Sequence, residues 1–394
     1  MALRFDYTPK EVFPTSRLPP NFAAVNKQII IPPKRQRVQR LCLRLLLLYI
    51  GVGCLPRTAS AQAEDSLRYA CGVDYVTEGQ FNLRNGQAAW ANRLDLELGA
   101  KLWRNACADL GLMATWRQGD DVASVCQDFS NINAPGKALR LTQAGLTQTF
   151  GSAWSLFAGL GQVDRAYFDT PMASLFTGAS YGCLPTLADN FHINVYPLSA
   201  LGLQLSYSPV ESLTLRASLW NGNAGDTPST QFRFRPKADG IIHVGSLTWE
   251  QSARDDEPLT PLWQVGWNVG NHYRPATGGR HTQAGFWLTA EQPVCRLGRA
   301  HLHLGGTFSH EFSDPEVAKT YWNLIAACHG VGTPEGTLAV VVERAFYHDA
   351  HETDVELTWS QPLTSWLTLQ PAVHFLRTSG RSQTVGQIRL SCSF

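Results

Sequence analysis

The sequence predicts an all-β protein, a transmembrane antiparallel up-and-down β-barrel of about 16 strands, with short periplasmic turns and long outer loops. Three observations predict this fold: the alternating segment that ends the chain, the recurrence of that alternation, and the unequal lengths of the connections. The net charge of +1 and the 16% of charged residues give no basic field that would attract nucleic acid. We therefore expect the lipid bilayer, and not nucleic acid, to be a partner.

The closing segment, residues 384–394, alternates along its whole length. Ile388, Leu390 and Phe394 fall on one side of a strand and Arg389 falls on the other, because successive side chains of a strand point to opposite faces. A strand that ends the chain on Phe resembles the last strand of a bacterial outer-membrane barrel, whose apolar face meets lipid. An amphipathic strand of a soluble sandwich is the alternative, since antiparallel sheets also alternate.

The front of the chain is interpreted as three segments. Residues 1–40 form an aperiodic extension, for which a start assigned too far upstream is one explanation. Residues 41–61 combine a preceding basic run, a short apolar stretch and small residues, which predicts a cleavable signal peptide. Cys54 as a lipoprotein site is a weaker alternative, because the residues before it lack the expected leucine. Residues 62–394 are then the barrel.

The same alternation recurs along the chain, as where Leu94 and Leu96 alternate with Arg93 and Asp95. Clear segments lie at 93–102, 108–116, 154–160, 201–207, 213–220, 263–269, 284–290, 302–308, 355–359, 367–375 and 384–394. Weaker segments lie near 67–76, 138–150, 241–250, 320–327 and 337–344. Together they predict about sixteen strands, an even number in the size range of diffusion channels.

The connections alternate between short and long in the first half of the chain. Short connections at 104–107, 151–152 and 208–211 are each followed by a long one, at 118–137, 162–199 and 221–240. An up-and-down barrel with tight turns at one end and long loops at the other produces this pattern. Residues 251–260 should form a turn and are long for one.

Several short motifs resemble the carbohydrate-selective porins of the OprB family. They include Asp164 with Phe168 after the strand that ends near residue 161, Tyr196-Pro197, the turn at 221–223 and the tail 352–394. The resemblance implies a barrel in the bacterial outer membrane that passes monosaccharides such as glucose by facilitated diffusion through a constricted pore. For the assembly, a homotrimer and a monomer are both open at this point. General diffusion without selectivity is the alternative.

Sugar selectivity needs polar groups that face the hydroxyls and aromatic planes that face the ring, with binding weak enough for release. The alternation and the resemblance together nominate ten residues for the pore lining or its constriction: Arg93, Asp95, Glu97, Asp164, Arg165, Phe168, Arg216, Trp220, Glu250 and Glu356. We expect the long connection 162–199 to fold inward and narrow the pore, and a surface lid is the alternative.

Two other classes of function are weaker. An outer-membrane barrel hydrolase would need a catalytic or metal site, and His301 and His303 share a strand face, but no HExxH or GxSxG motif is present. A soluble periplasmic sugar-binding β-protein would bury the Trp and Leu rows inside. We expect no catalytic residues, metal or cofactor.

Overall fold

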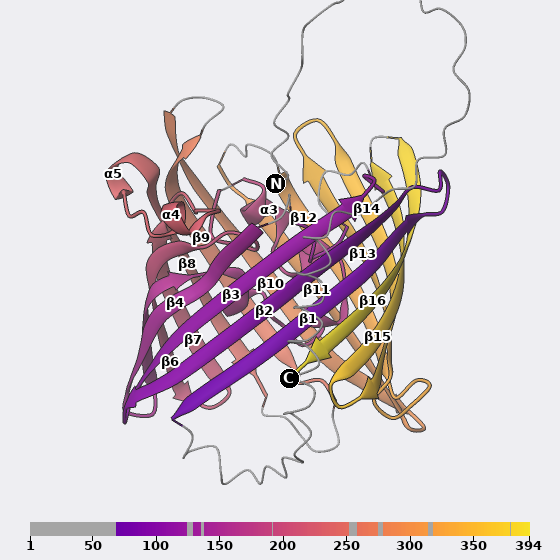
Figure 1. Cartoon of the computed structure of the whole chain (residues 1–394), viewed down its shortest axis with the longest axis horizontal. Coiled ribbons are helices and arrows are strands. Elements are labelled where there is room, and N and C mark those ends of the chain that lie inside the picture. Colours follow the sequence, from indigo (N-terminus) through magenta and orange to yellow (C-terminus); the bar gives the residue numbers. More distant parts are fainter. Residues whose placement is uncertain are drawn as a thin grey trace, which may run out of the picture. The chain divides into compact units, whose positions relative to one another are not determined.

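The computed structural model describes residues 68–123, 129–134, 138–190, 192–251, 258–274, 279–313, 318–378 and 380–394. The predicted extension, signal peptide and lipoprotein alternative, at residues 1–61, lie outside these described residues. The unit Arg68–Phe394 contains a closed barrel in which each strand pairs antiparallel with its sequence neighbours and β1 pairs with β16 (Figure 1). The predicted fold class and the count of sixteen strands are confirmed.

The strands follow one another around the wall in chain order. They are β1 (Tyr69–Asn82), β2 (Ala88–Trp103), β3 (Ala106–Gly119), β4 (Ala138–Phe150), β5 (Trp154–Gly161), β6 (Ala200–Val210), β7 (Leu213–Asn221), β8 (Gly240–Glu250), β9 (Leu262–Arg274), β10 (Gly279–Leu297), β11 (Ala300–Glu311), β12 (Ala318–His329), β13 (Thr337–Tyr347), β14 (His351–Thr364), β15 (Leu367–Thr378) and β16 (Arg381–Ser393). The weaker predicted segments are therefore real strands.

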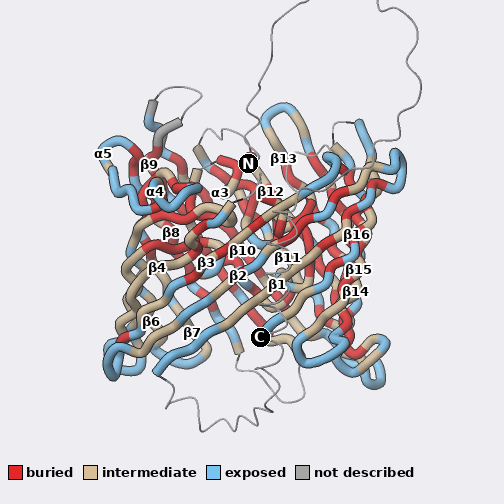
Figure 2. Tube along the Cα trace, in the orientation of Figure 1, coloured by how far each residue is buried: buried red, intermediate tan, exposed pale blue. Residues whose placement is uncertain are grey.

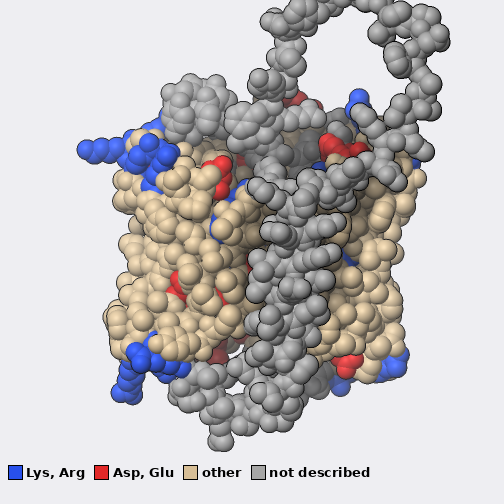
Figure 3. All heavy atoms as spheres, in the orientation of Figure 1, with Lys and Arg blue, Asp and Glu red and all other residues tan. Residues whose placement is uncertain are grey.

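The apolar rows point outward and the polar rows point inward. In β16, Ile388 is 53% exposed, whereas its neighbours Gln387 and Arg389 are buried on the inner face. Figure 2 shows this alternation along the strands, and Figure 3 shows an outer wall with few charged side chains between its two rims. A soluble sandwich would have the reverse arrangement, so these exposed apolar rows fit contact with lipid.

The lengths of the connections separate the two ends of the barrel. The turns at 104–105, 151–153 and 211–212 lie at one end, called the turn end, and the connections 120–137, 162–199 and 222–239 start from the other, called the loop end (Figure 1). After residue 250 the alternation of short turns and long loops weakens, as the long segment 251–260 already indicated: 251–261 is long at the turn end and 348–350 is short at the loop end.

The short helices belong to two of the long connections. α2 (Asp164–Tyr167), η2 (Ala173–Leu175), η3 (Ala179–Tyr181) and α3 (Pro185–Ala188) lie in 162–199, and α4 (Pro228–Gln231) and α5 (Pro236–Asp239) lie in 222–239. Among the described residues, no helix is both long enough and apolar enough to cross a membrane.

Candidate functional site

The connection 162–199, called the inner loop, lies inside the barrel. The Tyr167 hydroxyl oxygen lies 2.9 Å from both Ser218 Oγ of β7 and the Val244 carbonyl oxygen of β8, and its one proton is shared between these two acceptors. On another part of the wall, Thr186 Oγ1 donates to Ser309 Oγ of β11 at 2.8 Å. The strand partners all face inward, so the expectation that this loop folds inward is confirmed.

Two buried carboxylates hold the middle of the inner loop. Glu356 of β14 accepts hydrogen bonds from Thr177 N at 2.9 Å, Thr177 Oγ1 at 2.8 Å and Gly178 N at 3.1 Å. Glu291 of β10 accepts one from Met172 N at 2.9 Å. Hydrogen bonds to a charged acceptor contribute about 1.5–3 kcal/mol each, so these contacts fix the loop firmly across the lumen.

The connection 120–137 packs against the inner loop through its described residues. Asn131 N donates to the Thr177 carbonyl at 2.7 Å, and the Tyr196 hydroxyl donates to the Ile132 carbonyl at 2.7 Å. Arg389 of β16 joins both segments to the wall, because its Nη2 donates to Asn131 Oδ1 at 2.7 Å and to the Thr177 carbonyl at 3.5 Å. Two loops therefore narrow the lumen together.

A charged cluster is exposed to solvent where the inner loop faces β2 and β4. Arg165 of the loop forms an ion pair with Glu97 of β2, and its Nη1 also donates to Gln143 Oε1 of β4 at 3.2 Å. The Arg165 and Glu97 side chains are 38% and 47% exposed although both lie within the barrel. We call this partly solvent-exposed cluster, formed by Arg93, Asp95, Glu97, Gln143, Arg165 and Tyr196, the aperture.

An aromatic ring completes the aperture. Arg93 Nε donates to Asp95 Oδ2 at 2.6 Å, and the Arg93 guanidinium lies over the Tyr196 ring, 5.0 Å from its centre. Asp164 Oδ2 accepts a hydrogen bond from Tyr196 N at 3.1 Å, which fixes the backbone that carries this ring. Tyr196 was not among the nominated site residues, although its position in the Tyr196-Pro197 motif could have drawn attention to it.

Burial raises the pKa of Asp164 to about 6, because little water solvates the carboxylate, while the Tyr196 amide and Arg165 oppose this shift. A raised pKa means that the folded loop favours the neutral acid. The stabilising contribution is complete below the ordinary pKa of about 3.9 and is lost as pH rises through about 6.

We expect the unfolding temperature of the native chain, relative to that of Asp164→Asn, to be higher at pH 4 than at pH 7.5. The amide of the variant imitates the neutral acid and does not titrate. Thermal unfolding in detergent measures the difference, with the exposed neighbour Asp169→Asn as control. A native-minus-variant difference that is constant with pH would contradict this assignment.

The other nominated residues lie away from the aperture. Arg216 Nη1 of β7 donates to the Ala166 carbonyl at 2.6 Å and so holds the inner loop to the wall. Phe168 is buried against Trp287, with ring centres 5.0 Å apart, and Trp220 is 2% exposed. Of the remaining two, Glu356 is buried beneath the loop, and Glu250 is exposed at the turn end. Strand alternation assigned the lumen face but could not show which parts of it the loop covers.

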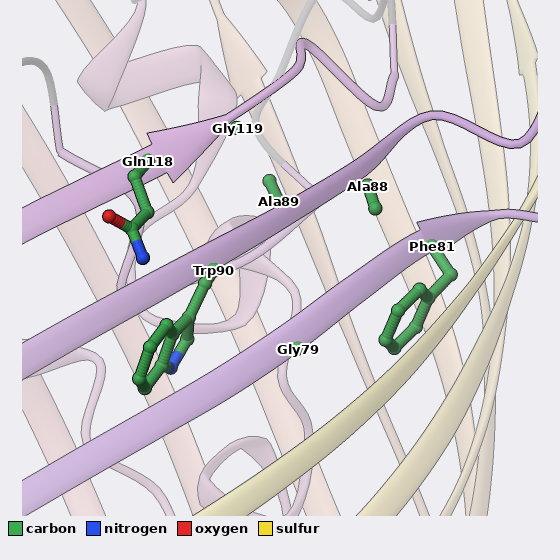
Figure 4. A pocket seen from close by; sticks show the side chains of 7 residues that line it. All are labelled: Gly79, Phe81, Ala88, Ala89, Trp90, Gln118 and Gly119. Carbon is green, nitrogen blue, oxygen red and sulfur yellow. The ribbon is translucent and has the colours of Figure 1, made fainter. Parts of the chain in front are cut away.

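An outward hollow of about 640 Å³ lies on β1–β3 rather than in the lumen (Figure 4). Its lining residues are Gly79, Phe81, Ala88, Ala89, Trp90, Gln118 and Gly119. Phe81 and Trp90 are 46% and 49% exposed on the outer wall, so the hollow belongs to the surface that meets lipid or another protein.

One set of contacts has the connectivity of a hydrolase triad. His374 Nδ1 lies 2.8 Å from Asp354 Oδ2, and its Nε2 lies 3.0 Å from Thr177 Oγ1. The Thr177 hydroxyl already donates to Glu356, so it can only accept from His374, and a histidine that donates through both nitrogens is not a base. Both Thr177 and His374 are fully buried, so this set serves to hold the loop.

His301 and His303 do not gather a metal site around them. No group of three or more His, Cys, Asp or Glu side chains in the described part of the chain is arranged to hold a metal ion.

A closed barrel with a polar lumen and inward-folded loops defines a porin, a diffusion channel of the outer membrane. The carbohydrate-selective porin family OprB matches residues 82–387, and the chain belongs to this family. It is therefore a carbohydrate-selective porin of the bacterial outer membrane.

Solved structures show the same fold at low sequence identity. The high-pH structure of Pseudomonas putida OprB has a TM-score of 0.72 at 18% identity, covering 84% of this chain and 96% of that one. The low-pH structure of Pseudomonas putida OprB has a TM-score of 0.58 at 17% identity, with 84% and 94% covered. An anion-selective porin from Comamonas acidovorans has a TM-score of 0.52 at 12% identity, with 83% and 99% covered. A comparison with curated protein sequences found no match.

Proposed function

We propose that monosaccharides such as glucose cross the barrel through the aperture, by facilitated diffusion and without catalysis. The observation that carries this proposal is the solvent-exposed Arg165–Glu97 ion pair inside the barrel. Arg93 and the Tyr196 ring lie beside this pair. Asp95 neutralises part of the Arg93 charge, so both signs are present. No single ion is favoured by such a mixture, whereas a neutral polyol finds donors and acceptors on several sides.

The residues suit a sugar for a further reason. A hexose ring has apolar C–H faces, and an aromatic plane contacts such a face while nearby charged groups bond its hydroxyls. The contacts are exposed to water, so each contributes little and release stays fast, as conduction requires. Arg216, Phe168, Trp220 and Glu356 act in this proposal by holding the inner loop, not by touching the sugar.

The test is liposome swelling with the refolded chain, comparing glucose, a disaccharide and an amino acid of similar size to glucose. We expect glucose to enter faster than the amino acid and much faster than the disaccharide. Entry graded by size alone would replace this proposal with general diffusion. Absence of entry through a correctly inserted barrel would reject a pore function for the aperture.

The same proposal includes export through cleavage of residues 41–61 and assembly as a homotrimer. An outward polar cluster on β1 and β2 supports assembly: Tyr75 OH and Thr77 Oγ1 donate to Asn92 Oδ1 at 2.8 and 2.9 Å. Such a cluster is unfavourable against lipid and fits a contact between subunits. The mass of the protein in detergent, after subtraction of the bound detergent, measures the assembly, and a monomer mass would reject it.

A further inference from the structure

A basic and aromatic segment stands at the loop end, between β7 and β8. Phe232 and Phe234 are 50% and 59% exposed, and they alternate with the exposed Arg233 and Arg235. Lys237 follows in α5 and is also exposed. Figure 3 shows Lys and Arg side chains gathered at the rim where Figure 1 places α4 and α5.

The segment is held firmly on both sides. Before it, the buried Gln231 donates through Nε2 to the Leu141 carbonyl at 2.7 Å and to Ser199 Oγ at 2.6 Å, which fixes α4 to the wall. After it, Asp239 accepts from Asn221 Nδ2 at 3.1 Å and pairs with Arg235 at 3.0 Å. The four residues 232–235 are therefore presented outward by anchored helices, and their exposure does not result from a loose end.

The positive charge of the segment is mostly unbalanced. Asp239 neutralises Arg235, but the Arg233 and Lys237 side chains make no hydrogen bond or ion pair with any residue that the structure describes. Arg280 of β10 adds a third cation nearby, because its Nη1 donates to the Lys237 carbonyl at 3.0 Å. An anion with more than one charge would find several cations here.

The position of the segment favours a lipid, rather than a soluble anion, as its ligand. β8 begins at Gly240, directly after α5, and Ile241 is already an outward apolar residue, 41% exposed. The cations and both Phe rings therefore lie at the edge of the apolar outer wall, where lipid headgroups meet acyl chains. Interfacial aromatic residues favour this level of the bilayer, and basic residues are attracted to its phosphates.

We propose that residues 232–237, with Arg280, bind a phosphorylated, multiply acylated lipid of the outer leaflet, the lipid A part of lipopolysaccharide. Arg233, Lys237 and Arg280 contact its phosphates, and Phe232 and Phe234 contact the upper parts of its acyl chains. The loop end carries this site because it faces outward in barrels of this class.

The test measures binding of fluorescent lipopolysaccharide to the refolded full chain in detergent. We expect Arg233→Glu with Lys237→Glu to weaken binding by about tenfold or more, and Phe232→Ser with Phe234→Ser to weaken it by a smaller factor. The matched control is Arg68→Glu with Arg104→Glu, an equal change of charge at exposed residues of the turn end. It should bind as the native chain does.

Dephosphorylated lipopolysaccharide separates the phosphate contacts from general adsorption to an apolar surface, and it should bind the native chain weakly. The proposal is overturned if the Arg233 and Lys237 variant binds as the native chain does, if the turn-end control loses as much, or if dephosphorylation changes nothing. Heat-dependent migration on a gel confirms that each variant is folded, and unchanged glucose swelling confirms that the aperture is intact.

Discussion

Glu356→Ala is expected to open the pore to disaccharides that the native chain excludes. The carboxylate accepts three hydrogen bonds from Thr177 and Gly178, and its loss leaves these donors buried without their acceptor. His374, 3.9 Å from the carboxylate, also loses a charged neighbour. Breaking a buried charged contact typically costs about 3–5 kcal/mol, which is enough to release the middle of the inner loop from the wall.

Liposome swelling with glucose and sucrose measures this effect, and we expect sucrose entry to rise several-fold. Glu356→Gln should have an intermediate effect, because one carbonyl oxygen still accepts from Thr177 while the amide group faces Gly178. Glu335→Ala removes the same charge from an exposed residue of a turn and should change nothing. Sucrose exclusion that persists in a folded Glu356→Ala barrel would show that the inner loop does not set the pore size.

Arg165→Ala is expected to make the pore prefer cations. The substitution removes the partner of Glu97 and leaves Asp95 and Glu97 facing only Arg93 across the aperture. A unit charge about 5 Å from an ion in water contributes about 0.8 kcal/mol, so local cation concentration rises by roughly fourfold. Glucose entry should fall as well, because a donor and the ion pair that holds the loop against β2 are lost.

The reversal potential of the channel in a potassium chloride gradient measures this change directly. Arg104→Ala, at an exposed turn outside the aperture, removes the same charge and is the control. A reversal potential that does not move in Arg165→Ala, or that moves equally in the control, would place Arg165 away from the path of the ions.

The alternation of side chains was enough to predict the barrel, because a strand between lipid and water must alternate. It grouped Arg93, Asp95 and Glu97 on one face of a strand, the face whose Glu97 pairs with Arg165 of the inner loop, and weak segments such as 337–344 proved to belong to full strands. Alternation also showed that 251–260 is long for a turn, but it did not give the lengths of the other connections after residue 250. No periodic constraint acts on a segment that leaves the wall.

The arrangement of the inner loop within the lumen depends on contacts between residues that are far apart in sequence. Glu356 binds Thr177, 179 positions away, and Thr170 binds Glu291, 121 positions away. Nothing in the local pattern around Glu356 distinguishes a residue that anchors a loop from one that faces a sugar. Phe168 was nominated from its place in the long connection and Trp220 from strand alternation, whereas the structure packs Phe168 against Trp287 and buries Trp220 in the same apolar cluster.

The most direct test of the aperture is to block it with a label. Glu97→Cys places a thiol in the aperture, and Glu250→Cys places one on the lumen face at the turn end. Each variant is treated with a bulky, neutral thiol reagent, and the native chain, whose described cysteines are free, is treated in parallel. Glucose swelling is then compared before and after labelling.

We predict that labelling of Glu97→Cys stops most glucose entry, while labelled Glu250→Cys and the treated native chain conduct as before. Full glucose entry through a completely labelled Glu97→Cys barrel would contradict the central claim, because the sugar would then pass the inner loop on another side.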